Sequence, residues 1–253
     1  MKKLIVSGDS CTDLEFESIC HPTWDFSWPK WPEHVAKHLG MELVCLGKGG
    51  QGNQYIYSTL QDEIIKTPKE EIGLVIAGWT QCHRKDYQNG YIGRWSALRV
   101  DQDGDLINHI RKTMRHMISF QTLCERYNLP YIHFQMGTMF ENMYKGLEPT
   151  ESDLILKKLT KGNVVPYDVI RTKEKDLEKM SDIIDSYKPF INNHVNWPFS
   201  APFGGDNMLD ILQVAKIKEL RISELDDHPN EKGHKIIADE LIKRMDKHGI
   251  NNL

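Results

Sequence analysis

The fold is decided by the stretch Leu4-Ile5-Val6-Ser7-Gly8-Asp9-Ser10, a short apolar run that ends in a glycine, an acid and a hydroxyl. Short apolar runs of this kind are typical of buried strands. Where they alternate with amphipathic stretches of helical period, they predict βαβ units, a parallel sheet and helices on both faces. We therefore expect the α/β class, as a three-layer α/β/α sandwich with a flavodoxin-like parallel sheet. Further strands are predicted at 43–46, 74–77 and 131–134, and helices at 31–39, 53–66 and about 106–127.

The length of the chain and its turn signals predict one domain with two interruptions. A chain of 253 residues can bury a single large core. We therefore expect one domain over residues 1–253. Asn89-Gly90 and an acidic, glycine-ended turn at 101–104 predict a hairpin-like insertion near 89–107. The prolines and glycines of 189–209 predict a long irregular loop of the kind that forms lids.

Composition excludes several classes of partner. A net charge of −4 and a pI near 6.3 give no sign of the basic face that nucleic acids require. The apolar runs are far shorter than the roughly 20 residues that span a bilayer, and the first residues lack a secretory signal pattern. We expect a cytoplasmic protein without nucleic-acid or membrane partners; the sequence does not define its oligomeric state. Five cysteines without a Cys-x-x-Cys pair indicate reduced thiols rather than disulfides or a metal site.

Residues from the two ends of the chain have the chemistry of a hydrolytic triad. Ser10 follows the first strand, and Asp226-Asp227-His228-Pro229-Asn230 precedes the last helical pattern. A serine becomes a nucleophile when an imidazole accepts its proton and a carboxylate orients that imidazole. Ligands of open α/β sheets bind at the carboxyl ends of the strands, where Ser10 lies. We predict a triad of Ser10, His228 and Asp226, with Asp227 as the alternative acid.

The glycine-rich stretch Gly47-Lys48-Gly49-Gly50-Gln51-Gly52 has the Gly-x-Gly-x-x-Gly spacing of dinucleotide-binding loops. However, it follows the second predicted strand, and the third ends in Gly78-Trp79-Thr80 without an acid that would bind a ribose. A glycine turn beside a serine nucleophile can instead present a backbone N–H to an oxyanion. We expect this second role and no cofactor. A nucleotide-binding protein is the alternative.

Together these segments resemble the SGNH/GDSL hydrolase superfamily. Gly8-Asp9-Ser10 is similar to its first block, residues 49–53 to its second block, and residues 228–234 to its last block. Ser27-Trp28-Pro29-Lys30-Trp31-Pro32 is similar to the stretch after the first block. The resemblance implies an α/β/α sandwich that hydrolyses esters through an acyl-serine intermediate, without a metal or an organic cofactor. It also implies that the N–H of Gly50 lines the oxyanion hole.

The sequence departs from the family pattern in two places. The third block, usually Gly-x-Asn-Asp, reads Gly78-Trp79-Thr80-Gln81 here, so the resemblance assigns the oxyanion-binding position to Thr80. Gln81 and Asn53 are the alternatives for that donor. The family's acid usually stands three residues before the histidine, where this chain has Leu225; Asp226 stands two before.

The expected function is that of a serine esterase or deacetylase acting on a small-molecule or glycan ester. The alternative is a catalytically degenerate member of the fold that binds a glycan or a protein. Trp24, Trp28 and Trp31 offer flat surfaces for a sugar ring or an acyl group, although such tryptophans also pack helices onto a core. Lys48 and Arg84 are either surface charges or groups that attract an anionic substrate.

Overall fold

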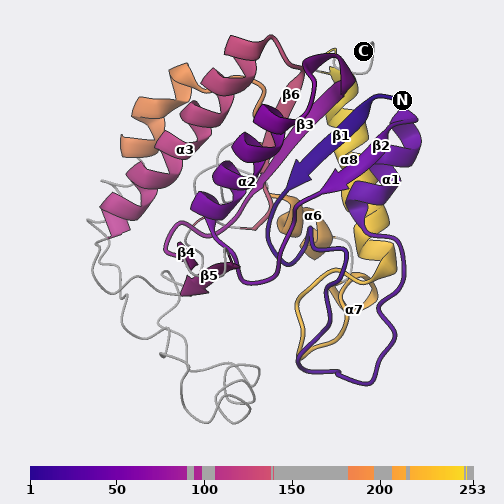
Figure 1. The fold of residues 1–253 in the computed structure, drawn as a ribbon. Helices are drawn as coiled ribbons and strands as arrows, with labels where there is room; N and C mark the ends of the chain where they lie inside the picture. The colour runs from indigo at the N-terminus through magenta and orange to yellow at the C-terminus, as the bar shows by residue number, and fades with distance from the viewer. Residues whose placement is uncertain are drawn as a thin grey trace.

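A four-stranded, fully parallel sheet forms the centre of the protein (Figure 1). The computed structural model describes residues 1–89, 94–98, 106–137, 139, 182–196, 207–214, 217–247 and 249. The order of the strands is β2-β1-β3-β6, which confirms the predicted flavodoxin-like parallel sheet. The strands are β1 (Lys3–Ser7), β2 (Glu42–Cys45), β3 (Ile72–Trp79) and β6 (Tyr131–Gln135).

Helices cover both faces of this sheet and complete the predicted three-layer sandwich. Helices α2 (Asn53–Lys66) and α3 (Leu106–Tyr127) pack on one face, and α1 (Trp31–Leu39) and α8 (Glu231–Lys247) on the other (Figure 1). None of the described helices combines the length and the apolar character needed to cross a bilayer. The shorter elements are η1 (Lys69–Glu71), η4 (Lys188–Phe190), α6 (Met208–Val214) and α7 (Ile217–Leu220).

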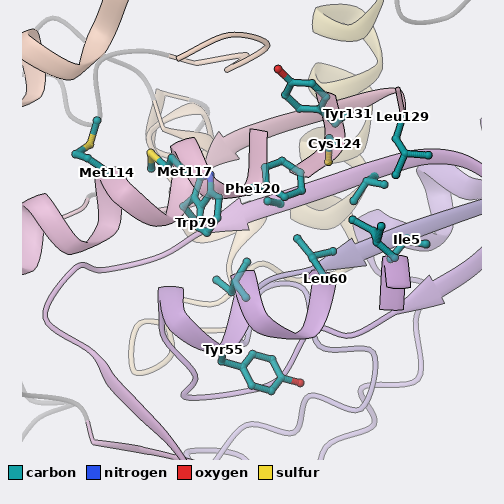
Figure 2. Close-up of a cluster of buried hydrophobic side chains, with 14 of the residues drawn as sticks. Ile5, Tyr55, Leu60, Trp79, Met114, Met117, Phe120, Cys124, Leu129 and Tyr131 are labelled. Atoms are coloured by element: carbon teal, nitrogen blue, oxygen red, sulfur yellow. The ribbon is translucent and has the colours of Figure 1, made fainter. Parts of the chain in front are cut away.

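Alternation along the strands divides the core into two clusters. Successive strand side chains point to opposite faces, so Ile5 packs with the α2–α3 layer and its neighbours Leu4 and Val6 with the α1–α8 layer. In the first cluster, Trp79 at the end of β3 meets Phe120 of α3 edge to face, with ring centroids 5.9 Å apart (Figure 2). The core therefore fixes the carboxyl end of β3, which is directly followed by Thr80 and Gln81.

An antiparallel pair of strands lies partly before and partly within the region where the sequence predicts an insertion. Strands β4 (Lys85–Asn89) and β5 (Arg94–Leu98) pair from Lys85–Leu98 to Asn89–Arg94. The first strand was missed because its sequence, Lys-Asp-Tyr-Gln-Asn, has no apolar alternation. Residues 90–93 and 99–105 lie outside the described part of the chain, as does 197–206 of the predicted lid-like loop.

The segment 220–230 forms a closed loop that leads into α8. Its two ends are joined because the Asn230 N–H donates to the Leu220 carbonyl at 3.0 Å and the Ile222 N–H donates to the His228 carbonyl at 2.9 Å. The Asn230 side chain donates to two further carbonyls, of Glu219 and Arg221, both at 2.9 Å. These bonds hold residues 226–228 in a defined position at the edge of the sheet.

Gly233 in the first turn of α8 should not tolerate alanine. An added Cβ would stand 2.2 Å from the Leu220 carbonyl oxygen, so the backbone would have to move. Alanine is favoured over glycine in a helix by about 1 kcal/mol, but overpacking a tight contact costs typically about 1–3 kcal/mol. Because the contact is with a backbone atom, the cost falls in the upper half of that range, and we expect Gly233→Ala to lower the free energy of unfolding in urea by about 1–2 kcal/mol in balance.

The matched control is Lys235→Ala, at an exposed position of the same helix. It should change the free energy of unfolding by less than about 0.5 kcal/mol. A Gly233→Ala protein as stable as the wild type would contradict the close approach of α8 to residue 220.

Candidate active site

Ser10, His228 and Asp226 form a continuous chain of hydrogen bonds at the carboxyl edge of the sheet. Ser10 Oγ lies 2.7 Å from His228 Nε2, and His228 Nδ1 lies 2.6 Å from Asp226 Oδ1. A carboxylate oxygen only accepts, so Nδ1 carries the proton and Nε2 is left to accept the proton of Ser10. Ser10 comes from the turn after β1, and the other two come from the loop before α8. The structure thus brings together three residues that the sequence singled out.

The acid beside the histidine is Asp226 and not Asp227. Asp226 Oδ1 also accepts the backbone N–H of His228 at 3.0 Å, which explains how an acid only two residues away can reach the ring. The side chain of Asp227 is 81% exposed and pairs with Arg221. The alternative acid is therefore excluded by geometry.

Ser18 holds the other oxygen of Asp226, which sequence reasoning missed. The buried Ser18 hydroxyl donates to Asp226 Oδ2. Burial alone would raise the pKa of Asp226, but the hydrogen bond and the charge of His228, together with the Ser18 bond, lower that pKa to about 2. The acid therefore stays ionised wherever His228 has to act as a base. No sequence signal links Ser18 to a residue 208 positions away.

Aromatic rings pack against the imidazole and around the site. The ring of Phe16 lies against that of His228, with centroids 4.2 Å apart and a 34° angle between the planes. Trp24 stacks on His21 at 4.0 Å, and His21 Nε2 is 2.7 Å from the Ser223 hydroxyl in the loop that carries the triad.

The tryptophans proposed for substrate binding have different environments. Trp31 is fully buried in the core and therefore packs a helix rather than binding a substrate, whereas Trp24 is 52% exposed. Trp28 is half-buried. The nearby His234 is buried and accepts the Trp31 N–H at 3.4 Å, while burial lowers its pKa to about 3. Trp31 and His234 thus belong to the packing of α1 against α8.

The glycine-rich loop lies against Ser10 and is held by acidic side chains. A Cβ at Gly49 would stand 3.9 Å from Ser10 Cβ, and the Gly49 N–H donates to Asp13 Oδ2 at 2.8 Å. Gly50 is exposed and has a φ of 78°, a left-handed conformation that favours glycine. Within the described part of the chain, the backbone N–H groups of Ser10 and Gly50 have no hydrogen-bond acceptor.

Asp86 of β4 accepts hydrogen bonds from backbone N–H groups at the start of α2. Its Oδ1 accepts the Gly52 N–H at 2.6 Å, and its Oδ2 accepts the Tyr55 N–H at 2.9 Å. A dinucleotide loop needs these free N–H groups for a pyrophosphate. Here they already bind a carboxylate, which would repel a phosphate. The nucleotide-binding alternative does not fit this arrangement.

The hydrogen bonds of Thr80 contradict its predicted role as an oxyanion donor. Its hydroxyl donates to Asp9 Oδ2 at 2.6 Å, and its N–H donates to Asn53 Oδ1 at 2.8 Å. A hydroxyl has one proton to give, so none is left for a substrate. Asn53, one of the alternatives, is also engaged: its Nδ2 donates to the Thr80 carbonyl and to the Thr113 hydroxyl, both at 3.1 Å.

Comparison with known proteins gives solved structures only. No protein-family model matches the sequence, and no curated protein sequence matches it. A protein named TesA aligns with a TM-score of 0.50 at 12% identity, over 97% of this chain and 99% of its own. A protein assigned to the G-D-S-L lipolytic family from Desulfitobacterium hafniense DCB-2 aligns with a TM-score of 0.48 at 14% identity, over 96% and 99%. The esterase EstA from Pseudoalteromonas sp. aligns with a TM-score of 0.47 at 12% identity, over 98% of both chains. The alignment with TesA shows that this chain shares the fold of that protein.

The low pKa of Asp226 should make stability depend on pH in the acid range. Because that pKa is about 2 in the folded protein and about 3.9 in an unfolded chain, ionised Asp226 stabilises the fold above pH 4. This contribution, on the order of 2 kcal/mol, is lost as the pH falls towards 2. We expect Asp226→Asn to show a correspondingly smaller fall in unfolding free energy between pH 5 and pH 2, measured by urea titration.

Asp239→Asn provides the control, because that carboxylate is 56% exposed on α8, where it forms an ion pair with Lys235. It should keep the acid dependence of the wild type. An Asp226→Asn protein that loses stability with acid as steeply as the wild type would contradict the assignment.

Proposed function

We propose that the protein is a serine hydrolase that cleaves esters through an acyl-serine intermediate. The observation that carries the proposal is the pair of bonds from Ser10 Oγ to His228 Nε2 and from His228 Nδ1 to Asp226 Oδ1, at 2.7 and 2.6 Å. This arrangement has the three roles that nucleophilic hydrolysis requires: a nucleophile, a base and a group that orients the base.

In the first half of the reaction, Ser10 Oγ bonds to the ester carbonyl carbon while its proton passes to His228 Nε2. The electron pair of the C=O double bond moves onto the carbonyl oxygen. His228 then gives its proton to the leaving alcohol as the C–O bond to that alcohol breaks. Asp226 stabilises the imidazolium throughout through Nδ1.

In the second half, a water molecule takes the place of the alcohol. His228 accepts a proton from the water as it attacks the acyl-serine, and then returns a proton to Ser10 Oγ when the acid leaves. The backbone N–H groups of Ser10 and Gly50 serve as donors to the oxyanion of both tetrahedral intermediates. Their lack of acceptors among the described residues supports this assignment.

The substrate we propose is a small or carbohydrate-linked ester. The His228 side chain is 33% exposed, so an ester can reach the triad without a large opening of the structure. The exposed face of Trp24 is connected through His21 and Ser223 to the loop of the triad. An exposed indole linked to the loop that carries the triad is suited to stacking against a sugar ring.

A second candidate is a catalytically inactive protein that binds a glycan or a protein partner. The observation that favours it is the hydrogen bond from the Thr80 hydroxyl to Asp9. Because of this bond, Thr80 cannot join the N–H groups of Ser10 and Gly50 as a third donor to the oxyanion. Losing one such donor costs about 3–4 kcal/mol of transition-state stabilisation.

Replacing Ser10 distinguishes the two candidates. We expect the wild type to hydrolyse p-nitrophenyl acetate with a burst of p-nitrophenol, and Ser10→Ala to lower kcat by at least about 10³-fold because the nucleophile is lost. Ser186→Ala is the matched control, because that hydroxyl is exposed and bonds to the Ile183 carbonyl.

Ser186→Ala should hydrolyse the ester at the wild-type rate. Equal rates for the wild type and Ser10→Ala would overturn the proposal. If neither protein hydrolyses esters but both bind the same sugars on a glycan array, the second candidate replaces it.

A further inference from the structure

A buried acid lies immediately beside the proposed nucleophile. Asp9 is 5% exposed, precedes Ser10 in the chain, and accepts hydrogen bonds from the Thr80 hydroxyl and the Cys11 N–H. The reaction proposed above creates a negative oxygen next to Ser10. The negative charge of a neighbouring carboxylate repels the negative charge on that oxygen, and the repulsion is stronger in a buried site than in water. A nearby positive charge is needed to offset it.

Arg84 is the cation that contacts this acid. Its Nη1 lies 3.5 Å from Asp9 Oδ2 and donates to the Gln51 carbonyl at 2.9 Å, while its Nε donates to Gln81 Oε1 at 3.3 Å. The guanidinium group therefore touches the turn after β1, the glycine-rich loop and the residues after β3. These are the three segments that would surround an oxyanion.

Close packing against the glycine-rich loop holds Arg84 in place, in addition to its polar contacts. A Cβ at Gly52 would stand 2.7 Å from Arg84 Cβ and 3.1 Å from its carbonyl oxygen, so the glycine-rich loop packs directly onto this residue. The Arg84 side chain is only 16% exposed. Lys48 of the same loop is exposed and in contact with water, where the field of a charge is screened.

A guanidinium group has donors to spare in this arrangement. It carries five N–H groups and keeps its proton at any working pH. Hydrogen bonds of Nε and Nη1 to Gln81 and Gln51 account for two of them. The two N–H groups of Nη2 have no acceptor among the described residues.

We propose that Arg84 stabilises the oxyanion in place of the side-chain amide that the third block lacks. It neutralises Asp9 and donates to the carbonyl oxygen through Nη2 as negative charge develops there. This inference rests on the proposed ester hydrolysis and names a further catalytic residue for it. Since the charge appears only in the transition state and intermediates, the contribution of Arg84 falls on kcat rather than on KM.

Substitution of Arg84 with chemical rescue tests the inference. For p-nitrophenyl acetate, we expect Arg84→Ala to lower kcat by about 10²–10³-fold, the usual loss for one oxyanion donor, with KM changed less than about threefold. Millimolar guanidinium chloride or ethylguanidine should restore part of the lost kcat in Arg84→Ala and have no effect on the wild type. Arg84→Lys should be intermediate because it keeps the charge but not the fork of donors.

Arg115→Ala is the matched control, because Arg115 is exposed on α3; it should have the kcat of the wild type. An Arg84→Ala enzyme with a kcat within threefold of an active wild type would overturn this inference and leave the proposed function intact. A loss of kcat that guanidinium does not restore, with a lower free energy of unfolding, would assign Arg84 a structural role and also overturn it. A wild type that neither hydrolyses esters nor reacts with a fluorophosphonate would overturn the proposed function, and this inference with it.

Discussion

One hydrogen bond, from the hydroxyl of Ser10 to the imidazole of His228, holds the proposed triad together and joins residues 218 positions apart. Two features of the fold bring these groups together. Strand β1 lies between β2 and β3 in the sheet, so Ser10 emerges at the middle of its carboxyl edge. Helix α8 packs on α1 (Figure 1). It begins directly after the closed loop 220–230, which places His228 beside Ser10. The core on both faces of the sheet thus determines the geometry of the site.

Three buried acids organise the site, and each has a different set of donors. Asp226 is bound by His228 and Ser18, which keeps it ionised and orients the imidazole. Asp86 binds the backbone N–H groups at the start of α2 and so sets the position of the glycine-rich loop. Asp9 is bound by Thr80 and approached by Arg84. Asp86 lies in β4, and Arg84 directly precedes that strand. The β4–β5 pair and the residue before it therefore form part of the site.

The sequence was sufficient for features that repeat locally. The four strands of the parallel sheet and helices α1, α2 and α3 followed from apolar periods, whereas β4, which has none, did not. The positions of Ser10, Asp226 and His228 followed from where strands and the last helix begin and end. Features that depend on contacts between distant segments could not be predicted. Nothing near Ser18 indicates that it bonds to Asp226, and nothing near Arg84 or Asp86 indicates that they hold the glycine-rich loop. The hydrogen bond from the Thr80 hydroxyl to Asp9 was missed for the same reason, because the two residues lie 71 positions apart.

Mass spectrometry of the protein after treatment with a fluorophosphonate shows whether Ser10 is an activated nucleophile. A hydroxyl reacts with such a reagent only when a neighbouring base accepts its proton and donors stabilise the charged adduct. We expect one phosphonyl group per chain, located on Ser10, and none after denaturation of the protein before treatment. An unmodified protein, or a phosphonyl group on a different residue, would contradict it.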